Sequence, residues 1–154
     1  MPLEIPFTEK DLHMTNNKDV VLRLWYQELW DNWNLGVADD LLTDDYHLHA
    51  PGVPVPLDRE TTKQVVAMYG ASFPDLKHTV DEMIVEGDTV GARWTVRGTH
   101  RGEFQGIAAT GNSITLSGLT VHHVTDRRLR ETWLVYDNME LLQQIGAVPA
   151  VAKA

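Results

Sequence analysis

Arg93 is the first side chain whose type and position could support chemistry. It lies in a segment, 89–99, in which apolar and polar residues alternate, so an extended strand would place Arg93 and Thr95 on the face opposite Trp94. The fixed fork of donors on a guanidinium suits planar oxyanions, so Arg93 could anchor a substrate carboxylate, enolate or carbonyl oxygen. The alternative is a structural ion pair with a helix carboxylate such as Glu28. Arg93 can bind a substrate only if the polar face of the strand lines an enclosed pocket and not if it faces bulk water.

His122 is the second candidate, because an imidazole can exchange protons near neutral pH. It falls in a predicted strand, 113–124, and shares a face with Thr120. Neighbouring antiparallel strands can hold side chains of one face about 5–8 Å apart, so we expect Arg93 to lie beside His122. The arginine charge should then lower the pKa of His122 and keep the imidazole neutral. We expect Arg93 to be the electrophilic anchor and His122 the proton acceptor or hydrogen-bond donor. The alternative is a hydrogen-bonded histidine that only shapes the cavity.

Hydrophobic periodicity and turn residues predict the elements that must position these side chains. Apolar residues at helical spacing predict helices at 18–33, 35–42 and 58–72, with Asp58 as the cap of the third. Alternation and turn signals predict strands at 46–50, 78–85, 89–99, 113–124 and 129–138, and one helical turn at 139–144. Helices followed by strands indicate an α+β domain, an antiparallel sheet with helices on one face.

The chain as a whole is interpreted as one domain. Residues 1–14 are expected to form an N-terminal arm, 15–146 the domain and 147–154 a C-terminal tail. The net charge of −9 argues against nucleic acid or an anionic membrane as a partner, since both need basic patches. There is no cysteine, which excludes disulfides and thiolate chemistry. With no signal-peptide pattern at the N-terminus, we expect a cytoplasmic protein.

Several segments, in their order and spacing, are similar to one known family. The segments are VVLRLWYQELWD, DDYHLHAP, FPDLKHTVDEMIVEGD, ARWTVRGTHRGEFQGI and ETWLVYDNMELLQQIG. Between Val20 and Gly146 the chain resembles the SnoaL-like polyketide cyclases, which belong to the nuclear-transport-factor-2-like cone-fold superfamily. The resemblance implies a cone-shaped, curved, mainly antiparallel sheet that wraps around a pocket and is covered by about three helices. It also implies a homodimer through the outer face of the sheet.

The chain departs from this family at the position of its acid/base aspartate. The family segment reads like EWDVWD, and ETWLVYD here places Leu134 at the aspartate position. A family histidine found two residues past a strand glycine falls at Thr120, after Gly118. A leucine cannot move a proton, and Asp137 lies three residues away, on the opposite face of the strand. We therefore expect that the usual aldol mechanism of the family does not operate here.

Limonene epoxide hydrolases, which share the cone fold, offer a second comparison. They carry an Arg-x-Asp pair that points into the pocket from the strand that corresponds to 89–99. The chain keeps the arginine as Arg93 and has Thr95 in place of the carboxylate. This resemblance implies that the polar face of the strand lines the pocket, and the missing carboxylate argues against epoxide hydrolysis by that mechanism.

Other side chains are expected to bind the substrate without reacting. His49 matches a family histidine and is expected at the pocket rim as a hydrogen-bonding residue. Tyr136 shares the face of Leu134, and an aromatic pocket that also includes Tyr26 would suit a flat or polyene substrate. The alternative for these aromatic rings is the core or a dimer interface. His47 and His49 could hold a metal on one strand face, but no third ligand with clear spacing is visible, so we expect no metal and no cofactor.

These observations together predict a cyclase or isomerase that acts on a hydrophobic, polyketide-type small molecule. The expected substrate-binding residues are Tyr26, His49, Thr95, Thr120, Leu134 and Tyr136. Without the aspartate, catalysis would depend on shape, because a pocket that holds a flexible substrate folded lowers the barrier by orientation alone. The alternatives are a non-catalytic small-molecule-binding protein and an epoxide-hydrolase-like enzyme with a different constellation of residues.

Overall fold

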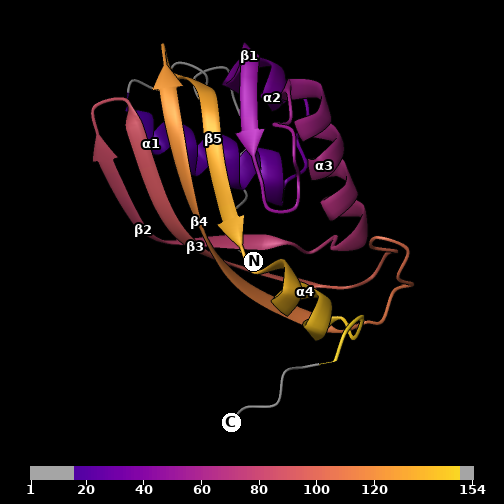
Figure 1. Cartoon of the computed structure of the whole chain (residues 1–154). Coiled ribbons are helices and arrows are strands. Elements are labelled where there is room, and N and C mark those ends of the chain that lie inside the picture. Colours follow the sequence, from indigo (N-terminus) through magenta and orange to yellow (C-terminus); the bar gives the residue numbers. More distant parts are fainter. Residues whose placement is uncertain (1–15, 150–154) are drawn as a thin grey trace.

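The computed structural model describes residues 16–149, which form a five-stranded curved sheet with helices on one side (Figure 1). The predicted arm at 1–14 and residues 150–154 of the predicted tail lie outside the described residues. The helical elements are α1 (Asn17–Asp19), η2 (Val20–Asp31), α2 (Val37–Leu41), α3 (Arg59–Ser72) and α4 (Asn138–Gln144). The strands are β1 (Leu42–His49), β2 (Lys77–Glu86), β3 (Thr89–Thr99), β4 (Ser113–Thr125) and β5 (Arg128–Tyr136). The α+β class is confirmed, and β3 has the predicted bounds.

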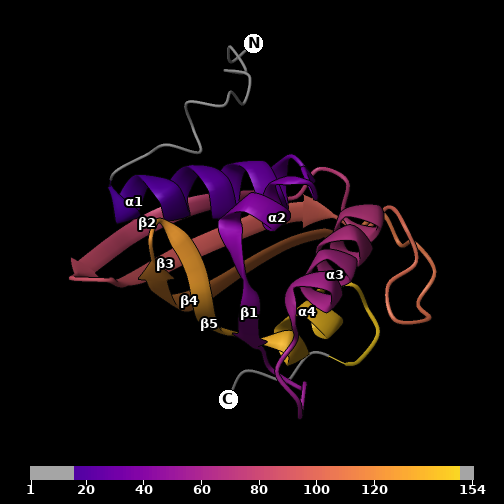
Figure 2. The same cartoon turned by 90° about the horizontal axis from the view of Figure 1, so that it is seen from above.

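The sheet has the strand order β1-β5-β4-β3-β2. Only the β1–β5 pair is parallel, so the sheet is mainly antiparallel, as predicted. The register between β3 and β4 is unbroken from Thr89 opposite His123 to Thr99 opposite Ser113. Seen from above, the helices α1 and α3 lie across the same face of the sheet (Figure 2). We call this covered face the inner face and the opposite one the outer face.

Asn16 caps the first helical segment, and its side chain accepts a hydrogen bond from the Lys18 amide at 2.9 Å. From Val20 to Asp31 the main chain is wound as a π-helix. Such winding is rare and often marks functional sites. Its buried residues include Trp25, Tyr26 and Trp30, so η2 presents a broad aromatic surface to the sheet.

α3 begins as the sequence predicts. The Asp58 carboxylate accepts hydrogen bonds from the Thr61 amide and the Thr61 hydroxyl, each at 2.8 Å. The helix ends at Ser72, and Pro74, which has no amide hydrogen, follows two residues later. Phe73 between them is fully buried against the core.

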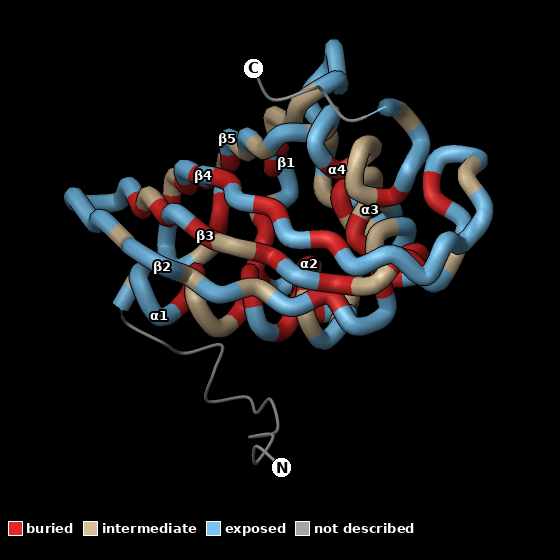
Figure 3. The backbone as a smooth tube through the Cα atoms, turned by 90° about the horizontal axis from the view of Figure 1, so that it is seen from below, coloured by how far each residue is buried: buried red, intermediate tan, exposed pale blue. Residues whose placement is uncertain are grey.

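Strict alternation along β3 and β4 separates the core from solvent, as the buried and exposed stretches of the tube show (Figure 3). Trp94 and Val96 point inward with Thr120, whereas Arg93 and Leu119 point outward. Gly118 lies directly opposite Trp94, and a Cβ atom at Gly118 would come within 2.2 Å of the indole. The glycine therefore provides the space in which the Trp94 ring lies across the inner face.

None of the helices in residues 16–149 is both long enough and apolar enough to cross a membrane.

Candidate functional site

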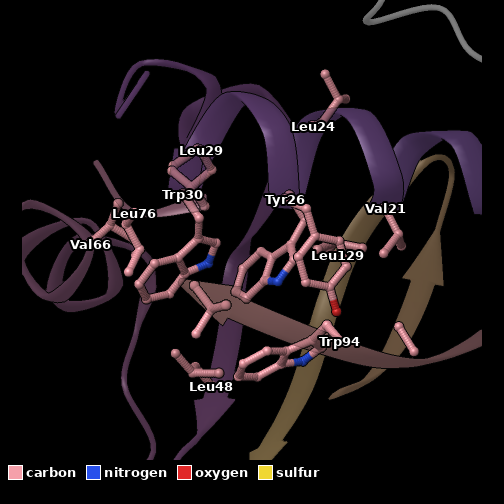
Figure 4. Packing of buried hydrophobic residues seen from close by; sticks show 14 of the residues in the cluster. Val21, Leu24, Tyr26, Leu29, Trp30, Leu48, Val66, Leu76, Trp94 and Leu129 are labelled. Carbon is pink, nitrogen blue, oxygen red and sulfur yellow. The ribbon is translucent and has the colours of Figure 1, made fainter. Parts of the chain in front are cut away.

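A cavity of about 390 Å³ lies between η2, α3 and the inner face of the sheet. Its wall is largely apolar, and Trp30, Trp94 and Leu48 converge there from η2, β3 and β1 (Figure 4). The polar side chains that reach the wall, apart from the tryptophans, are Tyr26, Tyr69, His78, Gln105, Thr120, Tyr136 and Asn138. Among the described residues, no aspartate, glutamate, lysine or arginine lines the cavity.

Four of the expected substrate-binding residues lie in this wall. Tyr26 enters from η2, Thr120 from β4, and Leu134 and Tyr136 from β5. Thr120 is opposite Leu134 in the register, and its hydroxyl accepts a hydrogen bond from the Trp94 indole at 2.7 Å. Burial raises the pKa of the Tyr26 phenol, so this side chain is neutral at physiological pH.

The prediction that Arg93 lines the pocket is wrong. Its side chain is 53% exposed on the outer face, where its nitrogens lie 3.7 Å from Asp81 and 3.8 Å from Glu82. Thr95 is on the same face and donates to Asp81 at 2.7 Å, so its expected place in the pocket is wrong too. The grouping of residues into two faces was correct, but the apolar Trp94 face lines the cavity. The ion pairs also involve β2 carboxylates rather than Glu28.

The predicted partnership between Arg93 and His122 is not formed, because the two side chains lie on opposite faces of the sheet. His122 is opposite Val90 and Thr132, whereas Arg93 is opposite Leu119. The His122 ring is completely buried, its Nδ1 lies 2.9 Å from the Thr132 hydroxyl, and it does not belong to the cavity wall. Its pKa is lowered to about 3, as predicted in direction, but the cause is burial rather than an arginine charge.

His49 also lies away from the predicted pocket rim. Its ring stacks on Trp133 with the centroids 5.0 Å apart, and its Nε2 lies 3.2 Å from Glu131. Its neighbours Leu48 and Ala50 do line the cavity. Alternation along β1 therefore turns His49 to the outer face.

Leu134 and Asp137, the two residues compared at the predicted aspartate position, point in different directions. Leu134 lines the wall, as expected, and Asp137 is directed to α4, where its carboxylate accepts from the Glu140 amide at 2.9 Å. Within residues 16–149, no group of three or more potential ligands among histidine and carboxylate side chains is arranged to hold a metal ion.

His78 and Asp31 form a polar pair that the sequence analysis missed. His78 lies on β2 opposite Val96, on the inner face, and belongs to the cavity wall. Its ring Nδ1 is 2.7 Å from Asp31 Oδ1, and both groups are nearly buried. The available signal was the position of His78 between Leu76 and Val80 in an alternating segment, which predicts an inward-facing histidine.

Tyr69 and Tyr136 form a second polar pair, through a short hydrogen bond between their hydroxyl groups. Tyr69 comes from α3 and was not among the expected site residues, whereas Tyr136 was. Burial raises the pKa of both phenols, so both are neutral at pH 7.

The chain matches the family model of the SnoaL-like polyketide cyclases over residues 20–145, which is most of its length. The chain belongs to the SnoaL-like polyketide cyclase family. The departures at Leu134 and Thr120 that the sequence predicts therefore concern single positions in a chain of this family.

Solved structures of SnoaL-like proteins support the assignment. IdmH from Streptomyces antibioticus, a candidate polyketide cyclase, is 32% identical with a TM-score of 0.76, over 85% of this chain and 99% of that one. AclR from Streptomyces galilaeus, a candidate hydroxylase, is 26% identical with a TM-score of 0.78. The match covers 89% of this chain and 85% of AclR. A candidate polyketide cyclase from Acidithiobacillus ferrooxidans is 28% identical with a TM-score of 0.75, over 86% and 96%. None of the curated protein sequences compared with the chain matches it.

Proposed function

We propose that this SnoaL-like protein is a cyclase or isomerase that folds a hydrophobic, polyketide-type small molecule inside the cavity. The observation that carries the proposal is the largely apolar cavity of about 390 Å³, which has Leu134 in its wall and no lining carboxylate among the described residues. Its size lies within the range of small-molecule sites, roughly 300–1,000 Å³. The aromatic side chains of η2 and β3 suit a flat or polyene skeleton.

The physical basis of such a reaction is orientation. A flexible chain loses conformational freedom on entering a shaped cavity, and the reacting carbons then meet without a further entropic cost. The 32% identity to IdmH, a candidate polyketide cyclase, supports the substrate class. The missing aspartate at the Leu134 position favours a ring closure that needs no strong carboxylate base in the last strand.

The test is to incubate the protein with linear unsaturated β-keto thioesters of graded length and to follow ring formation by liquid chromatography and mass spectrometry. We expect ring closure faster than in buffer, and we expect Leu134→Trp to abolish it by filling the cavity. Met139→Trp, at an exposed position outside the cavity wall, is the matched control and should behave like the wild type. Binding without ring formation for every thioester would contradict the proposal and favour a non-catalytic binding protein.

We also propose that the protein forms a homodimer through the outer face. Leu119 and Val121 on β4 lie opposite Val135 and Trp133 on β5, and all four side chains are exposed. Contiguous exposed apolar side chains are typical of protein interaction sites. Light scattering at micromolar concentration should show a dimer for the wild type and a monomer for Val121→Lys. A wild-type monomer at that concentration would contradict the proposal.

A further inference from the structure

The His78–Asp31 pair has the arrangement of a base and the carboxylate that orients it. The two Asp31 carboxylate oxygens lie 3.0 and 3.1 Å from the His78 backbone amide nitrogen. Asp31 Oδ1 also lies 2.7 Å from the His78 ring Nδ1. The carboxylate is thus held by the backbone and the ring of one residue. Because Asp31 ends η2 and His78 is the second residue of β2, the pair fixes the ring against the helix that covers the cavity.

This contact determines which ring nitrogen is free to react. An ionised carboxylate can only accept hydrogen bonds, so Nδ1 must carry the hydrogen of a neutral imidazole. Nε2 is then the nitrogen with the lone pair, and it has no hydrogen bond to any of the described residues. The rings of Tyr26, Trp30 and Trp94 surround His78, with centroids 5.4, 6.2 and 5.2 Å away. Their apolar surfaces limit competition from water.

The tyrosine pair supplies a hydrogen-bond donor in the same cavity. In the contact between Tyr69 and Tyr136 one hydroxyl donates to the other, so the accepting hydroxyl keeps its own hydrogen for a ligand. Donation from the first hydroxyl polarises the second and makes it a stronger donor. Tyr69 and His78 both contact Trp30, at centroid distances of 5.9 and 6.2 Å, so their rings are at most about 12 Å apart.

We propose that His78 is a catalytic residue that removes a proton from a carbon next to a substrate carbonyl, that Asp31 is its positioning residue, and that the Tyr69–Tyr136 pair donates to the carbonyl oxygen. The inference rests on the proposed function and narrows its substrate class to enolisable ketones. It places the proton-transfer group on β2, away from the position that Leu134 occupies in the last strand.

The step balances without a cofactor. His78 Nε2 takes the proton, and the electron pair of the broken C–H bond forms the enolate, whose oxygen accepts the tyrosine hydrogen bond. In a cyclisation the enolate carbon forms a C–C bond to a second carbonyl carbon, and the resulting alkoxide receives the proton from the imidazolium. In an isomerisation the proton returns to another carbon of the same skeleton.

The alternative is that the contact between His78 and Asp31 is purely structural and only stabilises the packing of η2 against β2. His78→Asn separates the two readings, because the asparagine amide can still donate to Asp31 from the place of Nδ1 but has no equivalent of Nε2. A structural tie would survive this substitution, whereas a proton acceptor would not.

The test uses 2-tetralone in D2O with the full-length protein. Deuterium uptake next to the carbonyl is followed by mass spectrometry, and binding by quenching of the cavity tryptophans. We expect His78→Asn to slow exchange by about 10²–10⁴-fold with the dissociation constant within about threefold of the wild type. His47→Gln, an exposed histidine outside the cavity, is the matched control and should exchange at the wild-type rate.

Two more variants keep the proposal testable if His78→Asn does not fold. Tyr136→Phe should slow exchange by at least about tenfold on an intact His78–Asp31 pair. Asp31→Asn should lower kcat for exchange with little change in KM, as expected for a residue that only orients the base. Wild-type rates in His78→Asn or in Tyr136→Phe would overturn the proposal.

The wild-type result separates this inference from the proposed function. Uptake of 2-tetralone without deuterium exchange above the buffer rate would overturn the inference and leave the proposed function intact. Failure of the cavity to take up the ketone would overturn both.

Discussion

At the scale of single residues, burial controls the proton affinity of His122. His122 is completely enclosed by protein, next to Thr132 and the ring of Trp25. Arg93 lies on the opposite face of the sheet, so burial alone, without a neighbouring cation, lowers the pKa of His122. The polar groups suited to chemistry are instead His78 and the tyrosine pair, each of which reaches the cavity.

The buried His122 should make the protein sensitive to acid. Its folded pKa of about 3 lies below the usual 6.5, so the unfolded chain binds more protons in that window. The contribution of His122 to the free energy of unfolding is fully present above pH 6.5. It falls with decreasing pH by at most about 1.4 kcal/mol per unit. Urea titrations between pH 4 and 7 should show the free energy of unfolding falling more steeply with decreasing pH in the wild type than in His122→Gln. Equal slopes in the two proteins would contradict the assignment.

At the scale of elements, the strand pair β3–β4 shapes the cavity through one glycine. A methyl group at Gly118 would collide with the Trp94 ring, whose indole donates to Thr120 in the cavity wall. We expect Gly118→Ala to displace Trp94 and to lower the free energy of unfolding by about 1–3 kcal/mol. Binding of 2-tetralone should weaken as well, and Gly91→Ala, where the nearest atom is 3.8 Å away, is the control. Unchanged stability and binding in Gly118→Ala would show that Trp94 can move freely.

The elements were largely predictable from sequence, because alternation and caps are local signals. Asp58 predicts the start of α3, and the alternation over 89–99 predicts both ends of β3 correctly. Alternation also places Arg93 and Thr95 on one face of β3, but it does not determine which of the two faces lines a cavity. The apolar side chains that line an open space look the same in sequence as those that fill a core. Asp31 and His78 are 47 residues apart, so their contact depends on how η2 packs over β2.

At the scale of the whole molecule, every tyrosine in the sequence is buried or partly buried in the folded domain. The four side chains are Tyr26, Tyr46, Tyr69 and Tyr136, and burial raises the pKa of each phenol. Above pH 10 the unfolded chain loses protons that the folded one keeps, so alkali should reduce stability. Phenolate absorbance at 295 nm should stay low past pH 10 and then rise together with the loss of far-ultraviolet circular dichroism. Smooth titration near pH 10 in the folded protein would contradict this packing.

The most direct test of the central claim, that this cavity binds and activates a ketone, is a crystal structure of the protein with 2-tetralone. We predict that the bicycle lies in the cavity beside Leu134 and that its carbonyl oxygen accepts a hydrogen bond from the Tyr69–Tyr136 pair. The carbon next to the carbonyl should face His78 Nε2. A ketone bound on the outer face, or bound in the cavity with its carbonyl turned away from the tyrosines, would contradict the account.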